Sequence, residues 1–280
     1  MPWPSWKPRE GPVSEAGETR RLLGLADRLR GPAVASAVEA LCLPPGGHGL
    51  DVGCGMGSQM EALVEASAPG GKVTGLDPQG EHLAAGRCLT DAAGISDRVS
   101  FRRGAAEALP FEADSFDWAW SVDCVGFIPG NPVEMLREMA RVVRQGGTVA
   151  LLLWSSQQLL PGYPFLEARL NGTRAGAAPA EPHWPPERHP LRALGWLTEA
   201  GLRGPAARTF LTDLASPFLE EEREALLALM EMRWGDPGEE LPDADVATFR
   251  MLTDRSAPES IVDRDDYFGF FTYTLFWGRV

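Results

Sequence analysis

The sequence predicts an α/β fold built on a doubly wound parallel sheet, and three observations support this prediction. Short apolar runs alternate with amphipathic segments along residues 49–154. A glycine-rich turn follows the first of these runs directly, with Gly53, Gly55 and Gly57 at every second position. Acidic residues, Asp51 and Asp77, stand at the ends of the first two runs. Strict alternation of strands and helices is typical of a parallel sheet with helices on both faces.

Each element of the first half follows from its residue pattern. Leucines at helical spacing indicate a helix that starts at Ser14, and Gly31-Pro32 is expected to interrupt it before a second helix over 33–43. Strands are expected near residues 49–52, 72–77, 99–102, 116–121 and 148–154. Helices are expected between them, near residues 58–66, 81–93 and 132–143.

The second half departs from this rhythm. Residues 155–190 are rich in Pro, Gly and Ala and predict a long irregular connection. Helices over 191–200, 219–233 and 244–252, a strand near 207–211 and a buried final strand over 268–277 follow. We therefore expect four regions: N-terminal helices that form part of a cap (1–45), a core (46–212), a helical cap insertion (213–266) and a final core strand (267–280).

Composition excludes several classes of function. The chain has 280 residues and carries 26 basic and 39 acidic residues, a net charge of −13 that argues against a nucleic-acid partner. None of its four cysteines forms a C-x-x-C pair, so we predict no metal site and a reducing, cytoplasmic location. The longest apolar run, residues 149–154, is too short to cross a bilayer.

The glycine-rich turn carries the strongest chemical signal. Glycine lets the backbone turn sharply and approach a ligand closely, and such a turn after the first strand is where doubly wound sheets bind nucleotides. Asp77 ends the next strand, where a carboxylate can accept both ribose hydroxyls. Asp77 can also cap the following helix, since Pro78 comes next.

On these residues the chain resembles class I S-adenosylmethionine-dependent methyltransferases, especially the branch around the ubiquinone and menaquinone C-methyltransferases. The resemblance covers roughly residues 30 to 155. Asp51-x-Gly53-x-Gly55-x-Gly57 is similar to the motif whose loop holds the methionine portion of the cofactor. Gly75-Leu76-Asp77-Pro78 is similar to the ribose motif. Residues 104–111 and 114–117 resemble the adenine-side loop and the following strand, and residues 132–147 resemble the helix and turn before the fifth strand.

The resemblance implies a Rossmann-like seven-stranded sheet with an antiparallel last strand and S-adenosylmethionine as cofactor. It also implies a set of cofactor-binding residues: Asp51, Gly53, Cys54, Gly55, Gly57, Asp77, Pro78, His82, Ala105, Ala106, Glu107, Ser121 and Asp123.

Four positions depart from the family pattern. Ala105 stands where the family usually has an Asp against the adenine amino group, so adenine would rely on backbone groups near Ala106 and Glu107. His82 replaces a Met and could stack on adenine or lie on the surface. Gly126 and Phe127 stand where this branch commonly has a His pair, which weakens any transfer of the quinone substrate class.

We therefore expect in-line methyl transfer to a small-molecule acceptor, which depends mainly on positioning. Asp123, His183 and Tyr163 are the candidates for a general base, and none is assigned.

A non-catalytic scaffold or sensor that binds the cofactor or its product is the alternative function. A nicotinamide-dependent oxidoreductase fits less well, because Ser58 occupies the third glycine position of that fingerprint. A homodimer is possible.

Aromatic residues suggest how the substrate opening is covered. Trp3 and Trp6 are predicted to pack over it. Trp184, Trp234 and Phe249 could line an apolar acceptor pocket or pack in the core, which is the more frequent fate of aromatic side chains.

Overall fold

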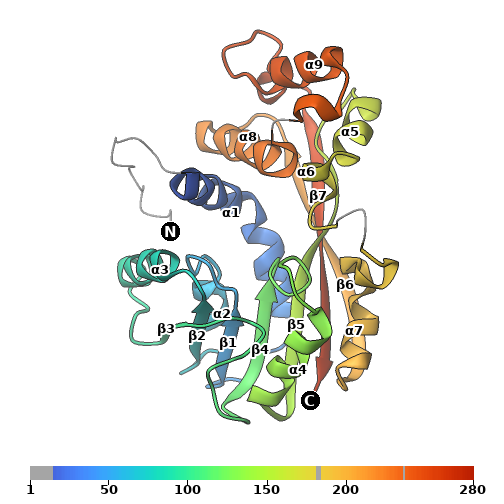
Figure 1. Ribbon diagram of the computed structural model, residues 1–280. Helices are drawn as coiled ribbons and strands as arrows, with labels where there is room; N and C mark the ends of the chain where they lie inside the picture. The colour runs from blue at the N-terminus through green and yellow to red at the C-terminus, as the bar shows by residue number, and fades with distance from the viewer. Residues whose placement is uncertain (1–14, 181–183, 236) are drawn as a thin grey trace.

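The computed structural model describes residues 15–180, 184–235 and 237–280, in which one seven-stranded sheet has helices on both faces (Figure 1). Its strands are β1 (His48–Val52), β2 (Lys72–Asp77), β3 (Val99–Arg103), β4 (Phe116–Val122), β5 (Val143–Gln158), β6 (Arg203–Ala215) and β7 (Phe268–Arg279). The strand order is β3-β2-β1-β4-β5-β7-β6. All pairs among β1 to β5 are parallel, whereas β7 runs antiparallel to both β5 and β6. The predicted seven-stranded sheet with an antiparallel last strand is confirmed.

Two layers of helices cover the sheet. One apolar core includes residues of α1 (Glu15–Ala40), α2 (Met60–Ala66) and α3 (Gly80–Ala92). The other core includes residues of α4 (Pro132–Val142) and α7 (Ala193–Glu199). The central strands β4 and β5 are therefore buried from both sides, which explains the nearly continuous apolar runs that predict them.

The predicted break at Gly31-Pro32 is wrong, because α1 continues through Pro32 as one helix. Proline has no N–H and crowds the preceding turn, so it kinks a helix, and Figure 1 shows α1 changing direction along its length. Apolar residues on both sides of the proline, Leu29 before it and Ala33 and Ala37 after it, are buried in the same core. This packing holds the two halves of α1 together.

The prediction of an irregular stretch over 155–190 is also wrong in part. Strand β5 continues to Gln158, and α5 (Pro164–Asn171) and α6 (Arg174–Ala177) follow it. The buried Glu167 carboxylate accepts the backbone N–H groups of Leu159 and Leu160 at 2.7 and 3.1 Å. These hydrogen bonds provide partners for the two backbone N–H groups, which are buried in the turn that follows the strand.

Helices at the carboxyl end of the parallel strands form a cap (Figure 1). Between β6 and β7 the chain forms α8 (Glu220–Trp234) and α9 (Asp243–Thr253), close to the predicted helices, together with the short turns η3 (Gly238–Glu240) and η4 (Ile261–Asp263). Helix α1 packs along α8, and Arg28 of α1 forms an ion pair with Glu221 of α8. The N-terminal helix and the cap insertion are therefore in direct contact. Within the described ranges, no helix is long and apolar enough to cross a membrane.

Candidate functional site

The glycine-rich turn joins the carboxyl ends of β1 and β2. The N–H groups of Gly53 and Cys54 both donate to the Leu76 carbonyl, at 2.8 and 3.0 Å. Gly53 has a φ of +76°, and a Cβ there would lie 2.3 Å from Sγ of Cys124. Gly55 also has a positive φ, +52°, but a Cβ there would meet no atom within 4 Å. Gly53 is therefore required by protein packing, whereas the backbone at Gly55 faces open space.

Asp77 shapes this turn as well as ending β2. Its Oδ2 accepts the Gly55 N–H at 3.1 Å, and its Oδ1 accepts the Gln79 N–H at 2.8 Å. Nδ1 of His82 lies 3.4 Å from Oδ1 of Asp77, so the predicted adenine-side histidine stands beside the predicted ribose carboxylate. Pro78 is exposed, and its carbonyl accepts Nε–H of Arg103 at 2.9 Å. The helix-cap alternative for Asp77 is wrong, because the N-cap residue of α3 is Gln79 and no side chain caps this helix. Asp77 instead lies at the strand end and accepts the N–H of Gln79 just before the helix begins.

Asp51 is a buried carboxylate without a protein partner. It is 1% exposed, and among the described residues neither oxygen has a hydrogen-bond partner. Burial, together with the nearby Asp77 carboxylate, raises the pKa of Asp51 to about 8. Buried polar groups are normally satisfied, so an orphaned carboxylate beside an open turn suits a ligand that carries positive charge. The open space at Gly55 and this carboxylate both fit the sulfonium cofactor that the resemblance implies.

Ser121 and Asp123, at the end of β4, are already engaged by the protein. Ser121 Oγ donates to the Val52 carbonyl at 2.9 Å, which ties β4 to β1. Oδ1 of Asp123 accepts the Trp154 N–H at 2.9 Å, and Oδ2 accepts the Tyr273 hydroxyl at 2.7 Å. Nη1 of Arg30 lies 3.6 Å from Oδ2 of Asp123. Burial raises the pKa of Asp123 against the opposing effect of Arg30. The Asp123 carboxylate thus joins α1, β4, β5 and β7.

The predicted adenine-side loop is a tight turn. Ala105 and Ala108 form an isolated β-bridge, and Ala106 is buried between them. Glu107 is exposed, and its carboxylate lies close to Gly130, where an added Cβ would be 3.3 Å from Oε1. Ala105 to Glu107 therefore lie between the end of β3 and the loop that precedes α4.

The other candidates for a base lie in different places. Tyr163 precedes α5 under the cap, beside Arg264. His183 lies outside the described residues. The structure thus does not bring Tyr163 together with Asp123 through any direct contact among the described residues.

The aromatic residues of the cap are mostly packed in the core. Trp234 is fully buried, its Nε1 donates to Asn171 at 2.8 Å, and it contacts Phe249 edge-on at 5.8 Å between ring centroids. Trp234 of α8 and Phe249 of α9 therefore pack in the hydrophobic core, which is the more frequent of the two alternatives for aromatic side chains. Trp184 is half-buried beneath the Arg188 guanidinium, 4.1 Å from its ring centroid. Trp3 and Trp6 lie outside the described residues.

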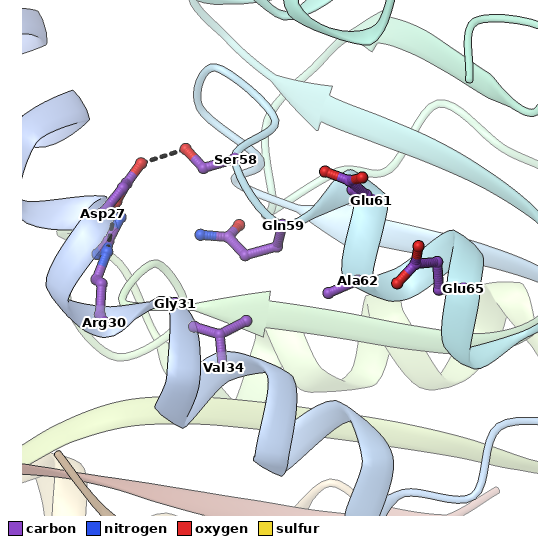
Figure 2. Close-up of a pocket in the computed structure, with 9 residues that line it drawn as sticks. All are labelled: Asp27, Arg30, Gly31, Val34, Ser58, Gln59, Glu61, Ala62 and Glu65. Carbon is purple, nitrogen blue, oxygen red and sulfur yellow. Dashed lines mark hydrogen bonds and ion pairs between the residues drawn. The ribbon is translucent and has the colours of Figure 1, made fainter. Parts of the chain in front are cut away.

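Sequence reasoning missed the polar residues that α1 brings to the glycine-rich turn. Asp27 accepts a hydrogen bond from the Ser58 hydroxyl, and Arg30 forms ion pairs with Asp27 and Asp123. A cavity between α1 and α2 includes Arg30, Ser58 and Gln59 in its lining (Figure 2). The only signal in the sequence was an arginine and an aspartate one turn apart in a leucine-rich helix, and that pattern is common on solvated helix faces.

Comparisons with known proteins cover the segment that contains the glycine-rich turn. Residues 50–151 match the family model described as a methyltransferase domain. A methyltransferase (GfsG) of Streptomyces halstedii is 34% identical over 140 residues, 50% of this chain and 45% of that protein. A demethylmenaquinone methyltransferase of Bacillus cytotoxicus is 38% identical over 122 residues, 42% of this chain and 49% of that protein. The chain spans about half the length of the curated relatives it matches.

Solved structures share the fold over most of the chain. The YcgJ protein of Bacillus subtilis has a TM-score of 0.57 and 18% identity, and the match covers 89% of this chain and 98% of that one. A geranyl diphosphate methyltransferase in complex with S-adenosylmethionine has a TM-score of 0.52 and 19% identity, with 96% and 92% covered.

The strand order and the glycine-rich turn are in line with these matches. Residues 50–151 are similar to a methyltransferase domain, and the resemblance to class I S-adenosylmethionine-dependent methyltransferases is confirmed over that segment.

Proposed function

We propose that the protein transfers a methyl group from S-adenosylmethionine to a small-molecule acceptor. The observation that carries this proposal is the pairing of open space at Gly55 with the unpartnered Asp51 carboxylate behind it. An unobstructed stretch of backbone next to a buried acidic group, which a nearby cation would favour in its ionised form, suits a cationic ligand lying along the turn. Asp77, at the adjoining strand end, supports the ribose end of the same ligand.

The residues of this chain would hold and orient the cofactor. The turn over residues 53–57 would take the methionine portion, Asp77 would accept the ribose hydroxyls, and His82 with residues 105–107 would lie on the adenine side. The cofactor supplies an electrophilic methyl group, and in-line displacement needs donor and acceptor held about 3 to 3.5 Å apart. Asp123 positions α1 and the ends of β4, β5 and β7, since both of its oxygens accept hydrogen bonds from the protein. The cap would exclude water from the reacting atoms.

Calorimetric titration with S-adenosylmethionine and S-adenosylhomocysteine tests the cofactor assignment. We expect micromolar binding by the wild type and a loss of at least about tenfold in Asp77→Ala, which removes a charged hydrogen-bond acceptor. Asp91→Ala is the matched control, because Asp91 is an exposed carboxylate near the end of α3. A folded wild type that binds neither ligand would contradict the proposed function.

Acceptors can then be screened by the formation of S-adenosylhomocysteine. The names of similar proteins suggest that demethylmenaquinone and geranyl diphosphate be included in the panel. Gly126 and Phe127 replace the His pair of the quinone branch, so phenols, amines and thiols belong in it too. Tight cofactor binding without turnover on any acceptor would favour the scaffold alternative.

The net charge of −13 supports a small molecule over a nucleic acid as the acceptor. A homodimer and a cytoplasmic location remain predictions, which sedimentation and cell fractionation would test.

A further inference from the structure

Arg233, in the last turn of α8, is a half-buried cation where the cap meets the sheet. Its Nε–H donates to Oε1 of Gln157 at 2.8 Å, and its Nη2 donates to the Gly176 carbonyl at 3.1 Å. Both of these acceptors are neutral. Among residues 15–180, 184–235 and 237–280, no carboxylate lies within 4.0 Å of the Arg233 guanidinium nitrogens. Because charges removed from water are normally paired, this guanidinium is suited to an anionic ligand.

The Arg233 side chain is also held in a fixed orientation. Its guanidinium carbon lies 5.2 Å from the centroid of the Trp154 ring, and Trp154 is stacked on Phe271 with 4.8 Å between ring centroids. Gln157, which accepts from Arg233, is oriented by a hydrogen bond from its Nε2 to Oδ1 of Asn171 at 3.0 Å. A guanidinium has five N–H donors, more than the two hydrogen bonds to the protein use. Arg233 is therefore prepared to bind an anion without first becoming ordered.

This cation lies near the reacting end of the proposed cofactor site. Burial raises the pKa of Asp123, and the nearby charges of Arg30 and Arg233 oppose this rise. Asp123 follows the end of β4, and the next residue, Cys124, packs against the glycine-rich turn, where a Cβ on Gly53 would lie 2.3 Å from its Sγ. Figure 1 shows α8 in the cap, beyond the carboxyl end of β4. Arg233 thus brings positive charge from the cap to the end of the sheet where the proposed function places the reacting atoms.

The neighbouring acid does not balance this charge. Asp123 lies 3.6 Å from Arg30, which also pairs with Asp27, and Asp123 accepts the Tyr273 hydroxyl as well. Burial lowers the pKa of Arg233 against the opposing effects of Asp123 and Tyr273, as expected for a cation with too little compensating charge. The chain has 39 acidic and 26 basic residues, so the missing partner does not reflect a shortage of acids.

We propose that Arg233 binds an anionic group, a carboxylate or a phosphate, on the methyl acceptor and so selects acidic acceptors over neutral ones. This inference rests on the proposed function for the presence of an acceptor beneath the cap. The planar guanidinium matches the oxygen geometry of both anions. Arg233 becomes a specificity-determining residue, and it is supplied by α8 of the segment between β6 and β7.

The test uses three probes that share one phenyl ring: benzoate, phenyl phosphate and the neutral benzamide. Each is titrated calorimetrically into the protein saturated with S-adenosylhomocysteine. The wild type should bind at least one of the two anions about 10- to 100-fold more tightly than benzamide, the usual effect of a charge-assisted hydrogen bond. The anion that binds more tightly identifies the preferred group. Arg233→Gln should bring the affinity for that anion down to the affinity for benzamide.

Arg208→Gln is the matched control. Arg208 is an exposed arginine of β6 whose guanidinium also lies over an aromatic ring, 5.0 Å from the centroid of Phe210. This variant should keep the full preference for the anion. If Arg233→Gln fails to fold, Arg233→Lys provides a second test, because it keeps the charge and loses the planar fork. The preference should then fall by about two- to tenfold.

Three results would overturn the inference. A wild type that binds benzamide as tightly as both anions would show that no anion is selected. A preference that survives Arg233→Gln would assign it to another cation. Equal weakening of all three probes by this substitution would show that Arg233 acts only through the packing of the cap. Failure of the wild type to bind S-adenosylhomocysteine would instead contradict the proposed function.

Discussion

Oδ2 of Asp77 accepts the N–H of Gly55 across 3.1 Å, so one carboxylate links the end of β2 to the middle of the glycine-rich turn. The residue proposed to recognise ribose therefore also fixes the backbone that is proposed to hold the methionine portion. Changes at either residue should affect both ends of the cofactor site, and the glycines of the turn offer the cleanest comparison.

Gly53→Ala and Gly55→Ala should have different consequences. Both place Ala at a positive φ, which costs about 1–2 kcal/mol. Gly53→Ala also forces a Cβ against Cys124, so it should add about 1–3 kcal/mol of strain. Gly55→Ala meets open space, so the protein should stay folded and lose cofactor affinity. Urea denaturation and titration with S-adenosylhomocysteine measure the two effects, and a Gly55→Ala protein with wild-type affinity would contradict the assignment of the turn.

The pKa of Asp51, raised to about 8 by burial and by Asp77, predicts a pH-dependent stability. The folded state holds a proton on Asp51 between its ordinary pKa of 3.8 and about 8, whereas the unfolded chain releases it. The stability contributed by this group is therefore fully present below about pH 4 and is lost as the pH rises through 8. Asp51→Asn should flatten this part of the stability profile, as measured by denaturant unfolding between pH 5 and 9.

The same group should couple cofactor binding to proton release. A cationic ligand favours ionised Asp51, so affinity for S-adenosylmethionine should rise from pH 5 to pH 8. Titrations in two buffers of different ionisation enthalpy would measure the released proton, which should disappear in Asp51→Asn. Unchanged proton release in that variant would assign the coupling to another group.

Tyr273→Phe should destabilise the protein by about 1–3 kcal/mol, because it removes a hydroxyl donor from the buried Asp123 carboxylate. Tyr267→Phe is a close control, since the Tyr267 hydroxyl donates to the neutral Leu159 carbonyl at 2.9 Å. Its expected cost is about 0.5–1.5 kcal/mol. Urea denaturation of both variants tests whether Asp123 is ionised in the folded protein, and equal losses would argue that it is not.

Trp234→Ala should cost about 3–5 kcal/mol, because a fully buried indole leaves a cavity and a lost hydrogen bond to Asn171. Trp184→Ala, at a half-buried site, should cost less than about 1 kcal/mol. Thermal unfolding distinguishes core packing from a pocket role. A stable Trp234→Ala protein with altered acceptor preference would restore the pocket interpretation.

The parts of the site that could be predicted from the sequence are those encoded within a few residues. The turn at Gly53–Gly57 and the acid at Asp77 are local motifs, each fixed by the end of one strand. The central strands were recognisable because burial on both faces makes them apolar throughout.

Contacts between distant segments could not be predicted in this way. Arg30, Asp123 and Tyr273 come together from α1, the end of β4 and β7, and periodicity does not reveal that an arginine of α1 faces inward. Pro32 shows a related limit, since a local rule predicted a break that packing on both sides of the proline overrides.

Ala215 at the end of β6 and Phe268 at the start of β7 are partners across the sheet. The segment from 216 to 267 therefore leaves and re-enters the sheet at adjacent points. A segment anchored in this way can change length or sequence during evolution at little entropic cost and without shifting the register of either strand. Proteins of this architecture can thus differ in the inserted segment, including α8 and α9, while the sheet that holds its two ends stays the same.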